Sequence, residues 1–209
     1  MTMEFINFLA RWSHGLFGIT WIGMLYYFNF IQGAYFKEAT PEGLADAKAK
    51  LAPRALWWFR WGAMFTFLTG LVLIHYSYAR ISVNDFIILG IVLGTLMAAN
   101  VWMVIWPAQK VALGIVEGGD KAAAAAKALL ASRTNTLFSA PMLFGMFASG
   151  HYPVDPGYGG LGLYLALALV LALELNGLKG KMGPITSVKG VITSSLVLTA
   201  VLVAIIYAF

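Results

Sequence analysis

The chain has 209 residues, of which 60% are hydrophobic and 11% charged, and its formal net charge is +5. Soluble domains carry about 25% charged residues, so this composition excludes an ordinary soluble protein and favours an integral membrane protein. There is no cysteine, which excludes disulfides, thiolate metal sites, iron–sulfur clusters and covalent c-type haem within these residues. Lys and Arg in cytoplasmic loops explain the positive charge, so no nucleic-acid partner is expected.

Apolar stretches recur along the whole chain, and each is long enough to cross a hydrocarbon core of ~30 Å at ~1.5 Å per residue. The sequence therefore predicts an all-α integral membrane protein, a bundle of about six transmembrane helices in a single domain over residues 1–209. The expected spans are 8–33, 55–78, 84–106, 135–151, 159–178 and 188–208. The first is not a removable signal peptide, because Glu4 precedes it and no small-residue cleavage site follows.

Two of the connections are charged and rich in Ala, and each is expected to hold a short surface helix. In residues 37–54, Pro41 and Glu42 suit the first turn of such a helix. In residues 117–133, Asp120 is a candidate helix cap.

Positive charge is concentrated in the first, third and fifth connections, whereas the second holds only Arg80 and the fourth none. The residues concerned are Lys37, Lys48, Lys50, Arg54, Lys110, Lys121, Lys127, Arg133, Lys179, Lys181 and Lys189. The positive-inside rule then places these connections in the cytoplasm and both termini outside. We expect a multi-pass protein of the bacterial inner membrane with periplasmic termini.

This topology puts the three histidines on the outer side of the membrane. His14 lies early in the first span, His75 near the outer end of the second, and His151 at the end of the fourth. A buried neutral imidazole needs a hydrogen-bond partner or a metal. His151, at a helix end, is the weakest candidate for a ligand.

Two histidines on neighbouring helices at similar depth are a common way to hold a b-type haem. His14 and His75 are the candidate axial ligands, and Gly18, one turn beyond His14, leaves flat space for a porphyrin. Arg11 and Arg80 are candidate partners of the propionates. Two alternatives stay open: purely structural histidines, and a copper or zinc site on the same histidines.

Four segments carry a resemblance to a known family: "RWSHGLFGITWIGMLYYFNFIQ", "PRALWWFRWGAMFTFLTG", "MAANVWMVIWPAQ" and "SRTNTLFSAPMLFGM". Together they resemble the membrane domain of the bacterial membrane-bound urate oxidase family, from about residue 8 to about 150, with weaker likeness beyond. A looser similarity, a His followed by "WIG" in the first span, extends to CopD-like and protoporphyrinogen-oxidase-like membrane proteins. Some of those hold a b-type haem on a first-helix histidine, which implies the same role for His14.

The resemblance implies an oxidoreductase, but the urate-oxidising family continues into a c-type cytochrome domain, and this sequence stops at Phe209 without CxxCH. We therefore expect a b-haem membrane subunit that passes electrons to a separate outer-side cytochrome c or companion oxidoreductase. The alternatives are a cofactor-free accessory subunit of a larger membrane complex and a urate-oxidising enzyme in its own right. The sequence identifies no urate site.

Overall fold

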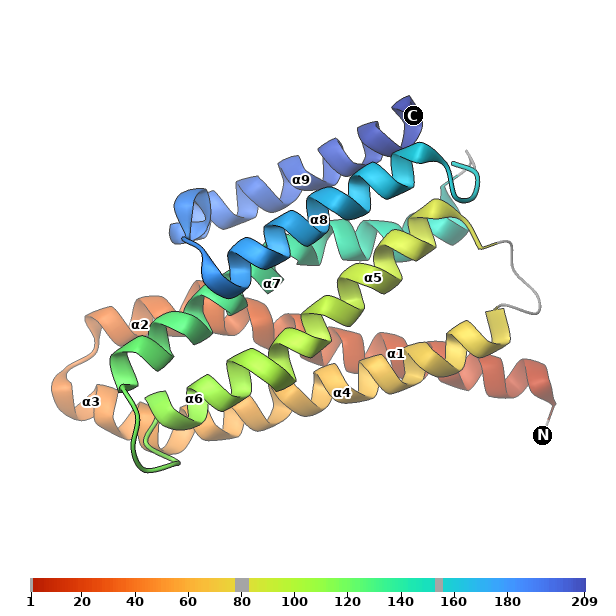
Figure 1. The fold of residues 1–209 in the computed structure, drawn as a ribbon. Helices are drawn as coiled ribbons and strands as arrows, with labels where there is room; N and C mark the ends of the chain where they lie inside the picture. The colour runs from red at the N-terminus through yellow and green to blue at the C-terminus, as the bar shows by residue number, and fades with distance from the viewer. Residues whose placement is uncertain (1, 78–82, 153–155) are drawn as a thin grey trace. The chain divides into compact units, whose positions relative to one another are not determined.

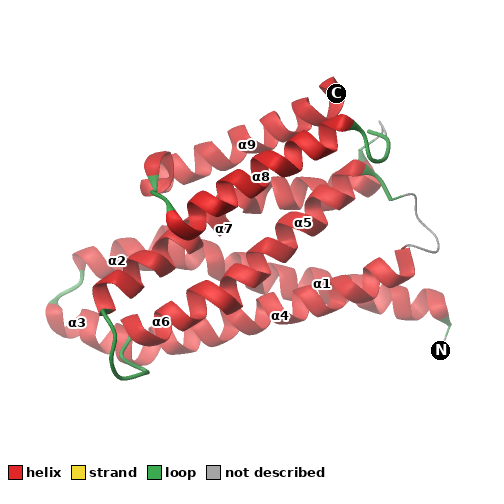
Figure 2. Ribbon diagram, viewed as in Figure 1, coloured by secondary structure: helices red, strands yellow, loops and turns green. Residues whose placement is uncertain are grey.

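The computed structural model describes residues 2–77, 83–152 and 156–209. Within these ranges the regular elements are helices and none is a strand (Figure 2). In chain order they are α1 (Met3–Tyr26), the π-helix η1 (Tyr27–Gln32), α2 (Gly33–Glu38), α3 (Pro41–Asp46), the π-helix η2 (Ala47–Leu51), α4 (Ala52–Ser77), α5 (Asp85–Ala99), the π-helix η3 (Asn100–Ile105), α6 (Trp106–Ala112), α7 (Lys121–His151), α8 (Leu161–Lys179), the 3₁₀-helix η4 (Gly183–Thr186) and α9 (Val188–Ala208).

Four helical stretches in the described part of the chain are long and apolar enough to cross a membrane. They are Pro41–His75, Asp85–Ala112, Leu161–Lys179 and Val188–Ala208. The predicted spans 8–33 and 135–151 fall on α1–η1–α2 and α7, which are long helices with more polar residues. The predicted class, an all-α multi-pass membrane protein, is confirmed.

The two surface helices begin as predicted but do not end as predicted. Thr40 caps α3 with Pro41 in its first turn, and the Asp120 side chain accepts hydrogen bonds from the N–H groups of Ala122 and Ala123. Neither helix is short, however. Pro41–His75 is one helical stretch, and α7 runs unbroken for 31 residues. The Ala-rich composition explains this continuity, because Ala has the highest helix propensity.

The helices group by their contacts into two compact units. Unit 1 comprises Met1–Tyr76 and Asn100–Ser132, and unit 2 comprises Ser77–Ala99 and Arg133–Phe209. The single transmembrane domain expected over residues 1–209 stays a prediction. Each unit is described by itself below.

In unit 1, α1 and α4 pack antiparallel in close contact (Figure 1). A Cβ added to Gly62 would lie 3.1 Å from the backbone nitrogen of Trp21, and one added to Gly70 would lie 3.2 Å from Cε1 of His14. At Thr66, which lies between Gly62 and Gly70 on α4, a Cβ added to Gly18 of α1 would be 3.9 Å from Cγ2 of the threonine. Small residues spaced one turn apart let membrane helices approach closely, and they set the register of this pair.

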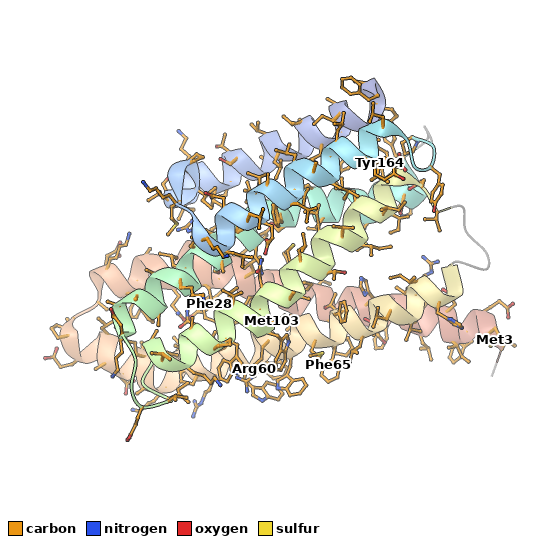
Figure 3. All side chains as sticks on the ribbon, viewed as in Figure 1. Met3, Phe28, Arg60, Phe65, Met103 and Tyr164 are labelled. Carbon is orange, nitrogen blue, oxygen red and sulfur yellow. The ribbon has the colours of Figure 1, made fainter. Side chains whose placement is uncertain are left out.

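The positive charge of unit 1 gathers at one end. In Figure 1, α2, α3 and α6 meet at the end away from the N-terminus, and Lys48 lies over the Phe36 ring at 6.0 Å. Arg60 stacks on the Trp106 ring at 3.8 Å, and Trp102 donates its indole N–H to the Arg60 carbonyl. Arg60 is labelled on α4 in Figure 3.

Unit 2 is built on close helix contacts at glycines. A Cβ added to Gly145 of α7 would lie 2.5 Å from the Phe86 carbonyl oxygen, and one added to Gly90 of α5 would lie 3.1 Å from the Met146 nitrogen. Glycine is therefore required for α5 and α7 to cross at this distance. Helices α8 and α9 lie side by side (Figure 1).

A proline inside α7 is accommodated by a side chain of α9. Pro141 has no N–H, so the Leu137 carbonyl four residues earlier loses its helical donor. Ser195 donates its hydroxyl proton to that carbonyl at 2.8 Å, and the Ser195 hydroxyl oxygen accepts from the Ala140 N–H at 3.4 Å. Ser195 thereby joins α7 to α9 at the break in the hydrogen-bond ladder.

Large apolar side chains remain exposed along the helices of both units. Phe65 is 40% exposed, Met103 75% and Tyr164 62%, and all three are labelled in Figure 3. Such side chains are stable in contact with lipid and costly in water, in agreement with the predicted contact with the bilayer.

Candidate functional site

His14 lies half-buried on the face of α1 that packs against α4. Its Nδ1 is 3.1 Å from the hydroxyl oxygen of Thr69, 55 residues further along the chain. Its ring lies beside Gly70, where any larger residue would meet the imidazole. The close approach of the helices at this glycine holds the ring in a defined place.

The hydrogen bonds of Thr69 favour one tautomer of His14. The Thr69 hydroxyl has two carbonyl acceptors in its own helix, Phe65 at 2.6 Å and Thr66 at 3.0 Å. A hydroxyl has one proton to donate, so toward His14 the Thr69 oxygen acts as an acceptor. Because the Phe65 carbonyl is the nearer acceptor, we infer that Nδ1 of His14 carries the proton and that Nε2 keeps its lone pair. Metal-ligating histidines usually donate their other ring N–H in this way.

His75, the second predicted ligand, lies further along α4. It follows Gly70 by five residues on α4, which amounts to ~7.5 Å of rise and a rotation of ~140° around the helix axis. Its side chain is exposed, whereas Thr69 and Gly70 face α1. The pairing of His14 and His75 as the two axial ligands of a haem therefore stays a prediction.

The other predicted haem residues are placed as follows. Gly18 is on the His14 face of α1, as expected, but that face is occupied by Thr66 of α4, so Gly18 serves close helix packing. Arg11 lies exposed, one turn before His14, and its Nε donates to the Asn7 side chain at 2.8 Å. Arg80 lies outside the described residues.

A haem held on one axial histidine stays a prediction. Nε2 of His14 is the nitrogen with a lone pair, Thr69 orients the ring, and a Cβ on Gly15 would have nothing within 4 Å. In the described part of the chain, no group of three or more His, Cys, Asp or Glu side chains is arranged to hold a metal ion. The copper or zinc alternative therefore has no additional ligands among those residues.

A row of buried polar residues lies on α7. Arg133, Thr134, Asn135, Thr136 and Ser139 are each at most 8% exposed, although Arg133 had been assigned to a cytoplasmic connection. Asn135 donates to the Met97 carbonyl at 2.9 Å, and Thr134 packs on Gly177 of α8. The available signal was the run of polar letters in "SRTNT" next to an apolar span, because such residues inside a membrane helix are costly unless they serve a purpose.

A second buried polar group belongs to unit 1, where α1 continues into η1. Asn29 donates to the Leu25 carbonyl at 2.9 Å and to the Ser132 hydroxyl at 2.8 Å. Because the Asn29 side chain takes the carbonyl four residues before it, the backbone widens there into the π-helix. π-Helical turns are frequent at functional sites.

The helices and their buried polar residues define a multi-pass α-helical membrane protein. The family model described as urate oxidase N-terminal matches residues 81–206. The chain belongs to this family. The match includes the last two helices, beyond the region where the sequence resemblance was strongest, and does not include the segment that holds His14 and His75. Comparison with curated proteins and with solved structures gave no match.

Proposed function

We propose that the chain is a urate oxidase-type membrane subunit that binds a b-type haem on Nε2 of His14. It passes electrons toward a cytochrome c or companion oxidoreductase at the outer side of the bacterial inner membrane. The observation that carries this proposal is the hydrogen bond from His14 to Thr69, because it leaves Nε2 as a ligand nitrogen. Haem, when bound, supplies one-electron chemistry.

The chain's own residues prepare the ligand. Thr69 orients the imidazole and keeps its proton on Nδ1, and Gly70 admits the ring against α4. Arg11, one turn away on α1, offers a cation that would offset a propionate charge. His14 is separated from the lysine-bearing end of unit 1 by the second half of α1 and by η1. This supports a location toward the outer face, with both termini outside.

The test is the absorption spectrum of the full chain purified in mild detergent, oxidised and reduced. We expect the Soret and α bands of a b-type haem in the wild-type protein and their loss in His14→Ala. His151→Ala, a histidine at the exposed end of α7, is the matched control and should keep the bands. Full haem content in His14→Ala would contradict the assignment, and no haem in the wild type would leave the accessory-subunit alternative.

His75→Ala decides between one and two histidine ligands. Because α4 turns His75 away from His14, we expect this variant to keep the wild-type coordination. Conversion to a five-coordinate, high-spin haem would instead make His75 the second ligand.

Family membership favours a second candidate function, oxidation of urate by the chain itself. If urate is the electron donor, its addition to the oxidised protein without oxygen should reduce the haem and consume urate. A haem that dithionite reduces but urate does not would restrict the chain to electron transfer.

A further inference from the structure

Arg133 is a buried cation without hydrogen-bond partners for two of its guanidinium nitrogens. It is 8% exposed, and its Nε and Nη1 have no partner among the described residues. A buried charge is stable only when it is paired and hydrogen-bonded. Two nitrogens of this cation are therefore open to an acceptor that the described residues do not supply.

The position of Arg133 in unit 2 argues against an ordinary interfacial arginine. The next residue, Thr134, packs on Gly177, two residues before Lys179 at the end of α8. Lys179 and Lys181 at this level are exposed, as expected for side chains that reach water. Arg133 has the same opportunity and remains buried.

The neighbours of Arg133 on α7 are polar and held in place. Thr136 shares its helix face, one turn on, and is 2% exposed. Asn135 is completely buried and is anchored to the Met97 carbonyl. A cation fixed among buried polar groups at the lysine-bearing end of unit 2 is arranged to receive an anion that enters from that side.

We infer that Arg133 is the anion-binding residue of a substrate site at the inner end of α7, and that it takes a small planar organic anion of the urate type. The naming of urate rests on the proposed function, whereas the anion site rests on Arg133 itself. A guanidinium presents several N–H donors in one plane, which suits a flat anion with adjacent oxygen or nitrogen acceptors.

The burial of Arg133 also indicates which of two anionic ligands it binds, a small soluble anion or a lipid headgroup. Headgroups lie at the membrane surface, where an arginine that binds them reaches outward and stays accessible. The 8% exposure of Arg133 favours an anion that enters the protein.

The test is equilibrium dialysis of radiolabelled urate against the full chain in mild detergent. We expect saturable binding to the wild type and a dissociation constant about tenfold to a hundredfold larger in Arg133→Gln, because a charged hydrogen-bond donor is lost. Arg54→Gln is the matched control. It makes the same chemical change at an exposed position and should leave the dissociation constant unchanged.

The thermal stability of the ligand-free protein separates binding from a structural role. If Arg133 is unpaired until a ligand binds, Arg133→Met removes an unpaired buried charge and should leave the unfolding temperature of the ligand-free protein unchanged or raise it. Urate should then no longer shift the unfolding temperature of this variant. If the charge is balanced inside the protein, for which Glu174 of α8 is the buried candidate, Arg133→Met should lower the unfolding temperature.

Three results would overturn the inference: no urate binding by the wild type, equal binding by Arg133→Gln, or a lower unfolding temperature in Arg133→Met. Native mass spectrometry from nanodiscs with phosphatidylglycerol provides the lipid comparison. Lipid retention that depends on Arg133, without urate binding, would identify a headgroup site instead. None of these readouts depends on haem, so failure here and failure of the His14 proposal are distinguishable.

Discussion

At the scale of single residues, one hydroxyl decides what His14 can do. Thr69 satisfies a carbonyl of its own helix with its proton and offers its oxygen to Nδ1 of the imidazole. The consequence is chemical, since a neutral histidine with a protonated Nδ1 presents Nε2 as a base or a ligand. The sequence indicated His14 but not Thr69. The two residues are 55 positions apart, and their contact depends on the register in which α1 packs against α4.

Replacing Thr69 by Val keeps the shape of the side chain and removes the acceptor of the Nδ1 proton. We expect the affinity for haem to fall about tenfold to a hundredfold, the usual effect of losing such a partner. The reduction potential should rise, because a less basic imidazole donates less to ferric iron. Haem titration and potentiometry measure both.

Thr66→Val is the matched control, because Thr66 donates only to Gly62 of its own helix and its methyl group against Gly18 is retained. Equal haem affinity in Thr69→Val and Thr66→Val would contradict the role assigned to Thr69.

At the scale of elements, unit 2 depends on the hydrogen bond from Ser195 that replaces the one missing at Pro141 in the backbone hydrogen-bond pattern of α7. We expect Ser195→Ala to lower the free energy of unfolding by about 0.5–2 kcal/mol, because the Leu137 carbonyl loses its donor at 2.8 Å. The loss should be smaller in a Pro141→Ala background, where the new N–H reaches the same carbonyl.

A double-mutant cycle of Ser195 and Pro141, measured by unfolding in detergent, gives this coupling. Thr199→Val is the control on the same helix, since Thr199 bonds only to the Ser195 carbonyl of α9. Additive losses in the cycle would show that Ser195 does not compensate for the proline.

The contact of α5 with α7 leads to a second prediction at this scale. Gly145→Ala should lower the free energy of unfolding by about 1–3 kcal/mol, because the added methyl would meet the Phe86 carbonyl at 2.5 Å. Gly150→Ala on the same helix, where nothing lies within 4 Å, should be neutral. Equal effects of the two substitutions would mean that α5 and α7 do not cross at Gly145.

The elements also indicate which features composition can predict. Apolar length located the fifth and sixth spans within two residues, because the cost of leaving such stretches in water depends on composition alone. It also located the second and third spans, but these helical stretches extend further, from Pro41 and to Ala112. The break expected between the surface helix in residues 117–133 and the span 135–151 was wrong, since a charged Ala-rich segment and an apolar one propagate the same backbone helix. Arg133 was missed for a related reason. The positive-inside rule counts charges, and burial of one of them depends on packing that no count contains.

At the scale of the whole molecule, the distribution of lysine predicts which ends face the cytoplasm. The native chain has no cysteine, so single-cysteine variants can be labelled without background. Lys48→Cys, exposed in η2, should react with an impermeant reagent only after the membrane is opened, and Tyr158→Cys, 72% exposed before α8, should react in intact cells. Labelling of Lys48→Cys from outside would invert the topology and place His14 toward the cytoplasm.

The central claim, that His14 is an axial haem ligand, is tested most directly by chemical rescue. His14→Gly removes the imidazole and leaves its space beside Gly70 open. We predict that the purified variant loses the b-type spectrum when haem is supplied alone and regains it when free imidazole is added with the haem. An imidazole-independent wild-type spectrum in His14→Gly would contradict the claim, as would a loss that imidazole does not reverse in a variant that stays folded.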